Sequence, residues 1–359
     1  EPAMQLFDDR DKGFIYSRWG NPTVEMAEQK IAVLETFGLD IQARAQMLSS
    51  GMAAISAVLL ACVKKGEKVL TQSQLYGTTD ELMQSLLPEL GIETIVADLQ
   101  NAKEVEALLK SDNKIKLVYI ETPSNPLMEV FDIAMLCKIA ARHKVKVAVD
   151  NTFSTPYLQQ PLKWGADFSV YSATKFLNGH GNSLSGFVVG RDNKFMRDKV
   201  WRYVKLIGAN SNAFDAWLLL QGLKTLPLRM ERHCANATKV AAFLQEHPAV
   251  AQVNYTGFKD HPQYKIVKKQ MRMPGAMISF ELKGGMKAGI KLMRKVKLCK
   301  LVTSLGTTDT LIQHPASMTH VNVPAQRRIS LGISDGFVRI SVGIEDIQDI
   351  LLDLDRGLN

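Results

Sequence analysis

The sequence predicts an α/β protein with a mainly parallel sheet, followed by a smaller α+β part. Between about residues 68 and 190, short apolar segments that look like buried strands alternate with segments of helical spacing. Continuous apolar strands between helices are typical of a parallel sheet that helices cover on both faces. After Arg191 the pattern becomes mostly helical, with strand candidates at 277–282 and 338–342. The second part therefore has a different organisation from the first.

Length and composition set the domain organisation. The chain has 359 residues, of which 46% are hydrophobic, enough for a sizeable core and two domains. We predict an irregular N-terminal arm over residues 1–24, a large domain over 25–226 and a small C-terminal domain over 227–359. The boundary is placed at Thr225–Pro227, where a proline precedes a long helical pattern.

Several classes of protein are excluded by composition. No apolar run approaches the roughly 20 residues of a membrane span, and we find no signal peptide, so we expect a cytoplasmic protein. The net charge is +8, but the basic residues are scattered and lack interleaved aromatic residues, so we expect no nucleic-acid partner. The four cysteines are dispersed without a C-x-x-C pair, which predicts neither a metal site nor a disulfide framework. They are Cys62, Cys137, Cys234 and Cys299.

The first segments carry two candidate anion sites. Tyr16 and Arg18 lie two residues apart, so an extended chain would point both toward one anion, although a plain surface loop is an equal alternative. Thr23 is the predicted N-cap of a helix over about 24–34. Further on, Ser50 and Gly51 form a turn that opens an alanine-rich helix over about 52–65. Such a turn presents backbone N–H groups to an anion, but it is also an ordinary N-cap.

The remaining elements follow in order. We predict strands at 68–71, 93–97, 116–121, 145–150, 168–172 and 186–190, and helices at 79–90, 102–109, 133–143, 194–203, 215–223, 228–247, 285–296 and 344–354. In a parallel sheet, ligands bind outside the carboxyl ends of the strands. The polar segments 121–126, 150–152 and 172–175 all follow predicted strands, so we expect the site there.

Lys175 is the residue around which the predicted site is organised. It follows a buried strand, Ser172 and Thr174 flank it, and a polar glycine run follows at 179–183. A partly desolvated lysine at the end of a sheet suits a Schiff base with a phosphorylated aldehyde. The two hydroxyl groups could then donate hydrogen bonds to the phosphate. The alternative is a surface lysine that happens to follow a strand.

Three other residues have both a functional and a structural interpretation. Asp150 ends a strand and could pair with a heterocyclic N–H, or it could cap the following turn. Tyr76 follows another strand and could stack on a planar cofactor, or it could be a core or turn tyrosine. Arg339 interrupts an apolar strand and needs an anionic partner, either a structural carboxylate or an amino-acid substrate.

Together these segments resemble the Cys/Met-metabolism family of pyridoxal-phosphate enzymes, which includes methionine γ-lyase, cystathionine γ-lyase and cystathionine γ-synthase. The resemblance covers essentially the whole chain. It rests on six motifs in order, namely residues 16–23, 50–54, 121–126, 149–152, 172–175 and 314–320. It implies the type I fold of aspartate aminotransferase, the cofactor pyridoxal 5′-phosphate and an amino-acid substrate.

The resemblance also implies roles for single residues. Lys175 would bond to the cofactor and move protons, Asp150 would contact the pyridine nitrogen, and Tyr76 would stack on the ring and act as an acid or base. The implied phosphate ligands are Gly51, Met52, Ser172 and Thr174, joined by Tyr16 and Arg18 of a neighbouring subunit. The substrate carboxylate would bind Arg339, with Asn125 and Ser304 assisting. Active sites shared in this way require at least a dimer, and the resemblance implies a homotetramer built from two such dimers.

The reaction that the resemblance implies is γ-elimination from methionine, homocysteine or cystathionine to 2-oxobutyrate, ammonia and a thiol, as in sulfur amino-acid metabolism and transsulfuration. The alternative is γ-replacement, as in cystathionine γ-synthase or O-acylhomoserine sulfhydrylase. Relatives that cleave cystathionine commonly have acidic residues where this chain has Ile15 and Thr303, which favours a small apolar leaving group. Methionine γ-lyases usually have a cysteine at Thr78, and many family members have an aspartate at Asn182; both are departures in this chain.

Overall fold

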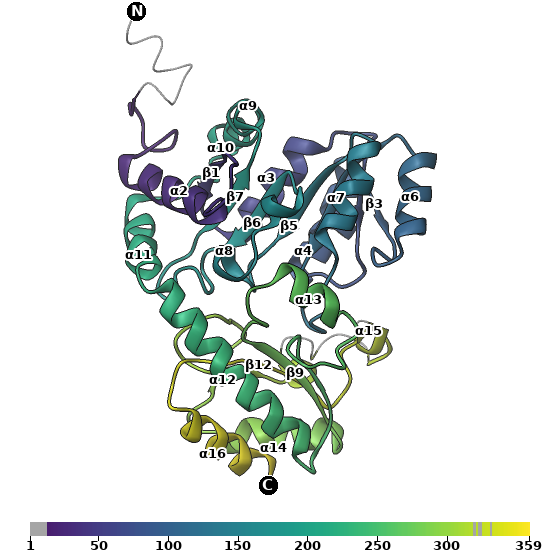
Figure 1. Cartoon of the computed structure of the whole chain (residues 1–359), viewed down its shortest axis with the longest axis vertical. Coiled ribbons are helices and arrows are strands. Elements are labelled where there is room, and N and C mark those ends of the chain that lie inside the picture. The colour runs from purple at the N-terminus through teal and green to yellow at the C-terminus, as the bar shows by residue number, and fades with distance from the viewer. Residues whose placement is uncertain (1–12, 319–320, 322–324, 331) are drawn as a thin grey trace, which may run out of the picture.

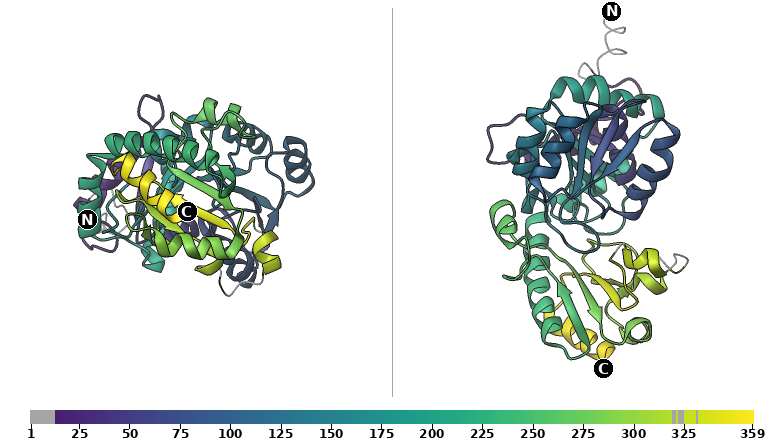
Figure 2. Two further views of the ribbon diagram at one scale, coloured as in Figure 1. Left: turned by 90° about the horizontal axis from the view of Figure 1, so that it is seen from below. Right: turned by 90° about the vertical axis from the view of Figure 1, so that its right-hand side faces the viewer.

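The computed structural model describes residues 13–318, 321, 325–330 and 332–359. Its strands form two sheets, and Figure 1 shows the sheet built from the first half of the chain above the sheet built from the last third. The side view in Figure 2 shows the same two-part arrangement. The first twelve residues of the predicted arm, and residues 319–320 of the last motif, lie outside the described part of the chain.

The first sheet is mainly parallel, as predicted. Its strands are β1 (Arg44–Leu48), β2 (Lys68–Thr71), β3 (Glu93–Val96), β4 (Ile115–Glu121), β5 (Lys146–Asp150), β6 (Phe168–Ser172) and β7 (Gly186–Gly190), in the spatial order β1-β7-β6-β5-β4-β2-β3. Strand β7 pairs antiparallel with both β1 and β6, and the other described pairings in this sheet are parallel. The carboxyl ends of β4, β5 and β6 therefore lie side by side.

Both faces of this sheet are covered at its central strands, which explains why β4 is buried along nearly its whole length. Along β4, Leu117 and Tyr119 pack into the hydrophobic cluster of helix α3 (Gly51–Cys62), whereas Val118 and Ile120 pack into that of helix α7 (Ile133–Arg142). Successive side chains of a strand point to opposite faces, so a strand with two buried faces shows no polar alternation.

The second sheet carries one of the predicted site residues at its centre. Its strands are β8 (Val250–Asn254), β9 (Met277–Leu282), β10 (Lys300–Leu301), β11 (Leu311–Gln313) and β12 (Phe337–Ser341), in the order β10-β11-β12-β9-β8. Arg339 lies on β12 opposite Gln313 of β11 and Ser279 of β9. Helices α12 (Leu226–Glu246), α14 (Gly285–Lys295) and α16 (Ile347–Leu358) pack against this sheet or one another.

A single hydrophobic cluster joins the two sheets. It includes Tyr171 and Phe187 from the first sheet, Met230 of α12, and Phe280 and Ile340 from the second sheet.

The remaining described α-helices are α2 (Pro22–Glu35), α4 (Gly77–Glu81), α5 (Leu87–Glu89), α6 (Ala102–Ser111), α8 (Thr155–Leu158), α9 (Asn193–Phe195), α10 (Arg202–Ile207), α11 (Ala213–Leu223), α13 (Tyr264–Gln270) and α15 (Ala325–Ser330). None of the described helices is long and apolar enough to cross a membrane.

Some predicted helix boundaries are wrong. The cap of α2 is Asn21, whose side chain accepts a hydrogen bond from Thr23 N at 2.9 Å, and the helix begins at Pro22 rather than after Thr23. The helix predicted at 79–90 is α4, a π-helical turn (Leu82–Leu86) and α5 in succession. Pro88 has no N–H to donate to the preceding turn, and a π-helical turn accommodates that loss. The helix predicted at 194–203 is likewise split by a π-helical segment (Met196–Trp201) between α9 and α10.

A buried carboxyl group, Glu35, fastens α2 to the first sheet. Its oxygens accept hydrogen bonds from Ser169 Oγ at 2.7 Å, from Leu162 N at 3.2 Å and from the Tyr171 hydroxyl. Burial raises the pKa of Glu35 from 4.5 to about 7, and these hydrogen bonds oppose the shift only in part. The folded state therefore holds a proton that the unfolded chain releases at a lower pH.

We expect this proton to make stability depend on pH. Because the pKa is higher in the folded state, the free energy of unfolding should fall as pH rises from about 4.5 through about 7. The variant Glu35→Gln lacks this ionisation. Between pH 4 and pH 8, its free energy of unfolding should therefore rise by about 3 kcal/mol relative to that of the parent. Urea unfolding at the two pH values measures the gain. The matched control is Glu25→Gln on the same helix, and an equal pH-dependent gain in that variant would contradict the assignment.

Candidate active site

The strand ends and the second sheet enclose one cavity of about 210 Å³. Glu121 and Asp150, the last residues of β4 and β5, lie opposite each other in register, and Ser172 ends β6. Arg339 enters the cavity from the second sheet. The lining residues are Ser50, Gly51, Met52, Ile55, Tyr76, Glu121, Pro123, Asn125, Asp150, Thr152, Phe153, Ser172, Thr174, Lys175, Leu184, Thr303, Leu305 and Arg339.

Lys175 lies half-buried in the turn after β6. Its backbone N donates to Ser172 O at 3.2 Å, and its Nζ donates to Ser304 Oγ at 3.0 Å. Burial, with a smaller contribution from the charge of Arg339, lowers the pKa of Lys175 from 10.5 to about 8. A much larger fraction of this amine is therefore neutral near pH 7 than for an exposed lysine, and a neutral amine can act as a nucleophile or a base.

Asp150 presents a carboxylate to the cavity. Its Oδ1 accepts from Thr152 N at 3.0 Å, and its Oδ2 accepts from the Tyr119 hydroxyl at 3.4 Å. Asp150 thus caps the turn, as the structural interpretation predicted, and it also faces the cavity. Burial raises the pKa of Asp150, and among the described residues no cation forms an ion pair with it. A ligand with an N–H⁺ group would supply that partner.

The start of α3 also lines the cavity. Ser50 caps this helix, and its Oγ accepts from Ala53 N at 3.1 Å. A Cβ added to Gly51 would lie 2.7 Å from Ser172 Cβ, so only glycine allows the helix to begin this close to β6. The first N–H groups of a helix have no partner within it, and the helix dipole favours an anion beside them. Ser172 and Thr174 line the same region.

Arg339 is buried, with 6% of its surface exposed. Its guanidinium donates to Asn125 Oδ1 at 3.1 Å and to the backbone oxygens of Thr303 and Ser304 at 3.2 Å each. No carboxylate pairs with it in the part of the chain that the structure describes. Two partners were predicted for Arg339, a structural carboxylate or a bound anion. The described residues contain no carboxylate that pairs with it, which leaves a bound anion. Burial lowers the pKa of Arg339 to about 10, so it remains charged near pH 7.

Glu121 holds Tyr76 at the mouth of the cavity, a contact that the sequence analysis missed. Tyr76 is 49% exposed, and its backbone N donates to Glu121 Oε1 at 2.9 Å and Oε2 at 2.8 Å. Burial, followed by the nearby charge of Asp150, raises the pKa of Glu121 well above 4.5. A glutamate that ends an apolar strand beside a strand ending in aspartate is the sequence signal that could have identified it.

The predicted residues therefore fall into two groups. Ten of them, Gly51, Met52, Tyr76, Asn125, Asp150, Ser172, Thr174, Lys175, Thr303 and Arg339, line the cavity, and Ser304 contacts both Lys175 and Arg339. The other four, Ile15, Tyr16, Arg18 and Thr78, do not line it. Tyr16 is 54% exposed, and Arg18 lies 5.1 Å over its ring and donates to Lys205 O.

No group of three or more His, Cys, Asp or Glu residues within the described ranges could hold a metal ion.

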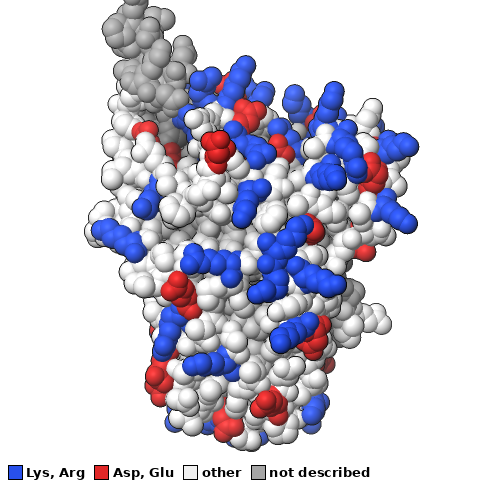
Figure 3. Space-filling model, viewed as in Figure 1, with Lys and Arg blue, Asp and Glu red and all other residues white. Residues whose placement is uncertain are grey.

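One face of the molecule carries many basic side chains. On the face shown in Figure 3, Lys and Arg side chains gather over α13 and the helices above it, with fewer acidic side chains between them. Lys268 and Lys269 lie in the last turn of α13, and Lys269 pairs with Asp132. The excess of positive charge favours the approach of anionic metabolites.

Comparison with known proteins places the chain in a family. A sequence model described as "Cys/Met metabolism PLP-dependent enzyme" matches residues 2–359. The L-methionine γ-lyases of Porphyromonas gingivalis and Fusobacterium nucleatum are 48% and 47% identical, and the alignments cover 100% of this chain and 88% and 89% of those proteins. A crystal structure of cystathionine γ-synthase from Xanthomonas oryzae superimposes with a TM-score of 0.90 at 38% identity, over 96% of this chain and 87% of that one. The chain belongs to the Cys/Met-metabolism family of PLP-dependent enzymes.

Proposed function

We propose that the protein catalyses γ-elimination from a sulfur amino acid, namely methionine, homocysteine or cystathionine, to give 2-oxobutyrate, ammonia and a thiol. One observation carries the proposal: a single cavity holds an amine whose pKa is lowered and a buried guanidinium that has no carboxylate partner in the described structure. The first group suits proton removal, and the second suits the carboxylate of an amino acid. The similarity to two L-methionine γ-lyases supports this choice within the family.

The cavity fits the family's cofactor, pyridoxal 5′-phosphate. Asp150 would face the ring nitrogen, and the start of α3, with Gly51, Met52, Ser172 and Thr174, would hold the phosphate. Tyr76 would cover the ring, and Lys175 would bond to the aldehyde carbon. When bound, the cofactor supplies an electron sink for the carbanion that forms at the substrate Cα.

The protein's own side chains would move the protons. Lys175 Nζ, held by Ser304 Oγ at 3.0 Å, would take the Cα proton, because its lowered pKa keeps part of it neutral. Arg339 and Asn125 would hold the substrate carboxylate and so fix the Cα–H bond relative to Lys175. A second proton must then leave Cβ before the group on Cγ can depart, and Tyr76, at the mouth of the cavity, would protonate the departing sulfur.

We propose that the leaving-group pocket suits a small apolar thiol. Thr303 lines the cavity and carries no charge, and Ile15 is 40% exposed on the N-terminal segment, from which it would reach a neighbouring subunit's cavity together with Tyr16 and Arg18. Thr78 is exposed on α4, and we propose that it lies beside the substrate once subunits assemble. Burying the charged end of cystathionine without partners should cost several kcal/mol, whereas the methyl group of methionine carries no such cost.

A product assay tests the proposed function. With methionine or homocysteine, the purified enzyme should form 2-oxobutyrate with a kcat/KM at least comparable with that for cystathionine. The double variant Ile15→Glu, Thr303→Glu should shift the ratio toward cystathionine. A parent enzyme that strongly prefers cystathionine would refute the pocket assignment.

The second candidate is γ-replacement, in which a thiol adds to an activated homoserine. The close superposition on a cystathionine γ-synthase favours it, because elimination and replacement can use the same residues up to the branch. The same assay with O-acetyl- or O-succinylhomoserine, with and without cysteine, separates the two. Fast joining of cysteine with slow release of 2-oxobutyrate would select replacement.

We also propose a cytoplasmic homotetramer made of two dimers, with the arm 1–24, a large domain 25–226 and a small domain 227–359. Several large apolar side chains are exposed on the described part of the arm and on α11, among them Phe14, Ile15, Phe214 and Trp217. Contact with another copy of the chain would cover such side chains. A monomer in solution with full activity would contradict this assembly.

A further inference from the structure

Three amide side chains lie in a row beneath the active site and bond to one another. Asn151 and Gln159 follow β5 and α8, and Gln270 ends α13. Their exposures are 0%, 2% and 5% respectively. A buried amide is costly unless its donors and acceptor are all paired, so such a cluster fixes the relative positions of the segments that carry it.

Gln159 is the centre of this row. Its Nε2 donates to Asn151 Oδ1 at 2.8 Å and to Thr122 O at 3.0 Å, and its Oε1 accepts from Gln270 Nε2 at 3.1 Å. Its backbone oxygen also accepts from Asn151 Nδ2 at 2.7 Å. Every polar atom of the Gln159 side chain is therefore used, and a substitution would leave several buried groups unpaired.

These contacts reach the three strand ends that carry the active site. Thr122 directly follows Glu121 at the end of β4, and Asn151 directly follows Asp150 at the end of β5. Asn151 Nδ2 also donates at 3.0 Å to the hydroxyl of Tyr171, the residue before Ser172 on β6. A shift of Gln159 would therefore be transmitted to the segments that position Asp150 and Lys175.

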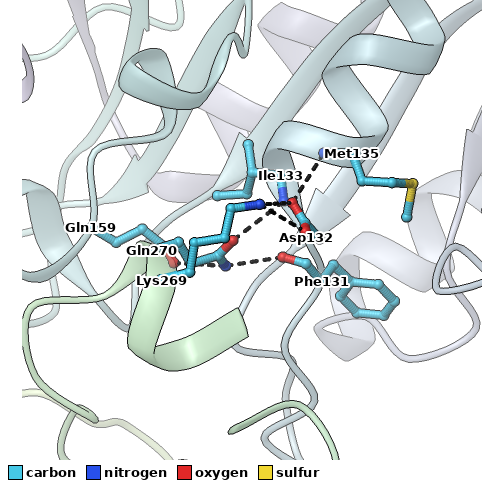
Figure 4. Close-up of polar contacts among 7 residues, drawn as sticks. All are labelled: Phe131, Asp132, Ile133, Met135, Gln159, Lys269 and Gln270. Carbon is cyan, nitrogen blue, oxygen red and sulfur yellow. Dashed lines mark hydrogen bonds and ion pairs between the residues drawn. The ribbon is translucent and has the colours of Figure 1, made fainter. Parts of the chain in front are cut away.

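Gln270, which bonds to Gln159, ties the segment that leads into the second sheet to these strand ends. Gln270 Nε2 donates to Phe131 O at 2.9 Å, and its Oε1 accepts from Ile133 N at 3.3 Å, as Figure 4 shows. Beside it, Lys269 pairs with Asp132 at 3.0 Å. Helix α13 leads along the chain into β9, which pairs with β12, and β12 carries Arg339. The row thus joins the arginine of one sheet to the lysine and aspartate of the other.

We propose that Gln159 is a positioning residue that sets the placement of Arg339 relative to Asp150 and Lys175, and thereby the affinity for the substrate amino acid. Gln159 does not line the cavity, and it acts through Asn151, Thr122 and Gln270. The inference rests on the proposed role of Arg339 as the carboxylate site. A merely structural role would lower stability and leave substrate affinity unchanged.

The test uses the holoenzyme and L-norleucine, which has the length of methionine but no sulfur leaving group. Its dissociation constant is measured from the change in cofactor absorbance, together with the thermal midpoint of unfolding. Gln159→Leu should raise this dissociation constant roughly tenfold to a hundredfold, since a misplacement of about 1 Å has effects of that size. The matched control is Gln160→Leu, whose amide donates to Leu34 O at 3.2 Å and Phe37 O at 3.1 Å, away from the row, and it should stay within about twofold.

A second variant keeps the test decisive if Gln159→Leu does not fold. Gln270→Leu removes the hydrogen bonds of α13 to Gln159, Phe131 and Ile133. It leaves the contacts of Gln159 with Asn151 and Thr122. It should also raise the norleucine dissociation constant. Variants that lower the thermal midpoint but bind norleucine like the parent would overturn the proposal. Because norleucine binding requires no elimination, this result is independent of whether the parent forms 2-oxobutyrate.

Discussion

Replacing Lys175 by alanine should lower the rate of 2-oxobutyrate formation by roughly 10²–10⁴-fold, the range that a positioned acid–base group contributes. The half-buried amine of Lys175 has a pKa lowered to about 8 and a hydrogen bond to Ser304 that aims it. Alanine removes the amine that we propose both as the base and as the group that bonds to the cofactor aldehyde. Steady-state rates with methionine measure the loss, and cofactor content after gel filtration shows whether the cofactor still binds.

The matched control for this variant is Lys194→Ala, which removes an exposed lysine on α9. The control should keep the parent rate. A Lys175→Ala enzyme that binds the cofactor and retains more than about a tenth of the parent rate would contradict the assignment of Lys175 as the base.

Replacing Arg339 by alanine should raise KM for the amino acid by roughly 10–150-fold. A hydrogen bond to a charged group contributes about 1.5–3 kcal/mol, which corresponds to that range of affinity. Arg339 is buried and already held by Asn125 and by two backbone oxygens, so its position is fixed before the substrate arrives. Initial rates over a range of substrate concentrations separate KM from kcat.

Arg339→Lys is the informative companion variant. It keeps the positive charge but loses the planar fork that binds a carboxylate through two parallel hydrogen bonds, so its KM should lie between those of the parent and of Arg339→Ala. Equal KM values for all three enzymes would show that the carboxylate binds elsewhere.

The sequence was sufficient to predict the site residues that stand at the ends of strands in the first sheet. Glu121, Asp150 and Ser172 end three adjacent strands, and the apolar strands before them predicted that their ends would meet. Lys175 follows from the same reasoning. Local sequence pattern could not identify the partners of Arg339, because Asn125 and Ser304 approach it from segments 214 and 35 residues away in the chain. Only the family resemblance pointed to these two residues.

Elements that depend on pairing rather than on local pattern were missed. Strands β10 and β11 have two and three residues, too short to show any periodicity, and they exist because β12 lies beside β11. The sequence analysis also missed β8 and α13, and with α13 the position of Gln270. A lone glutamine on a short helix gives no sequence signal, since its importance lies in a contact with Gln159, 111 residues away.

If Lys175 carries the cofactor, borohydride reduction of the purified holoenzyme will label this residue. Reduction converts a cofactor–lysine bond into a stable pyridoxyl group, which peptide mass spectrometry can locate. We expect a yellow protein that loses its colour on reduction, with the pyridoxyl group on the peptide that contains Lys175. A pyridoxyl group on another lysine, or a protein that takes up no pyridoxal phosphate at all, would contradict it.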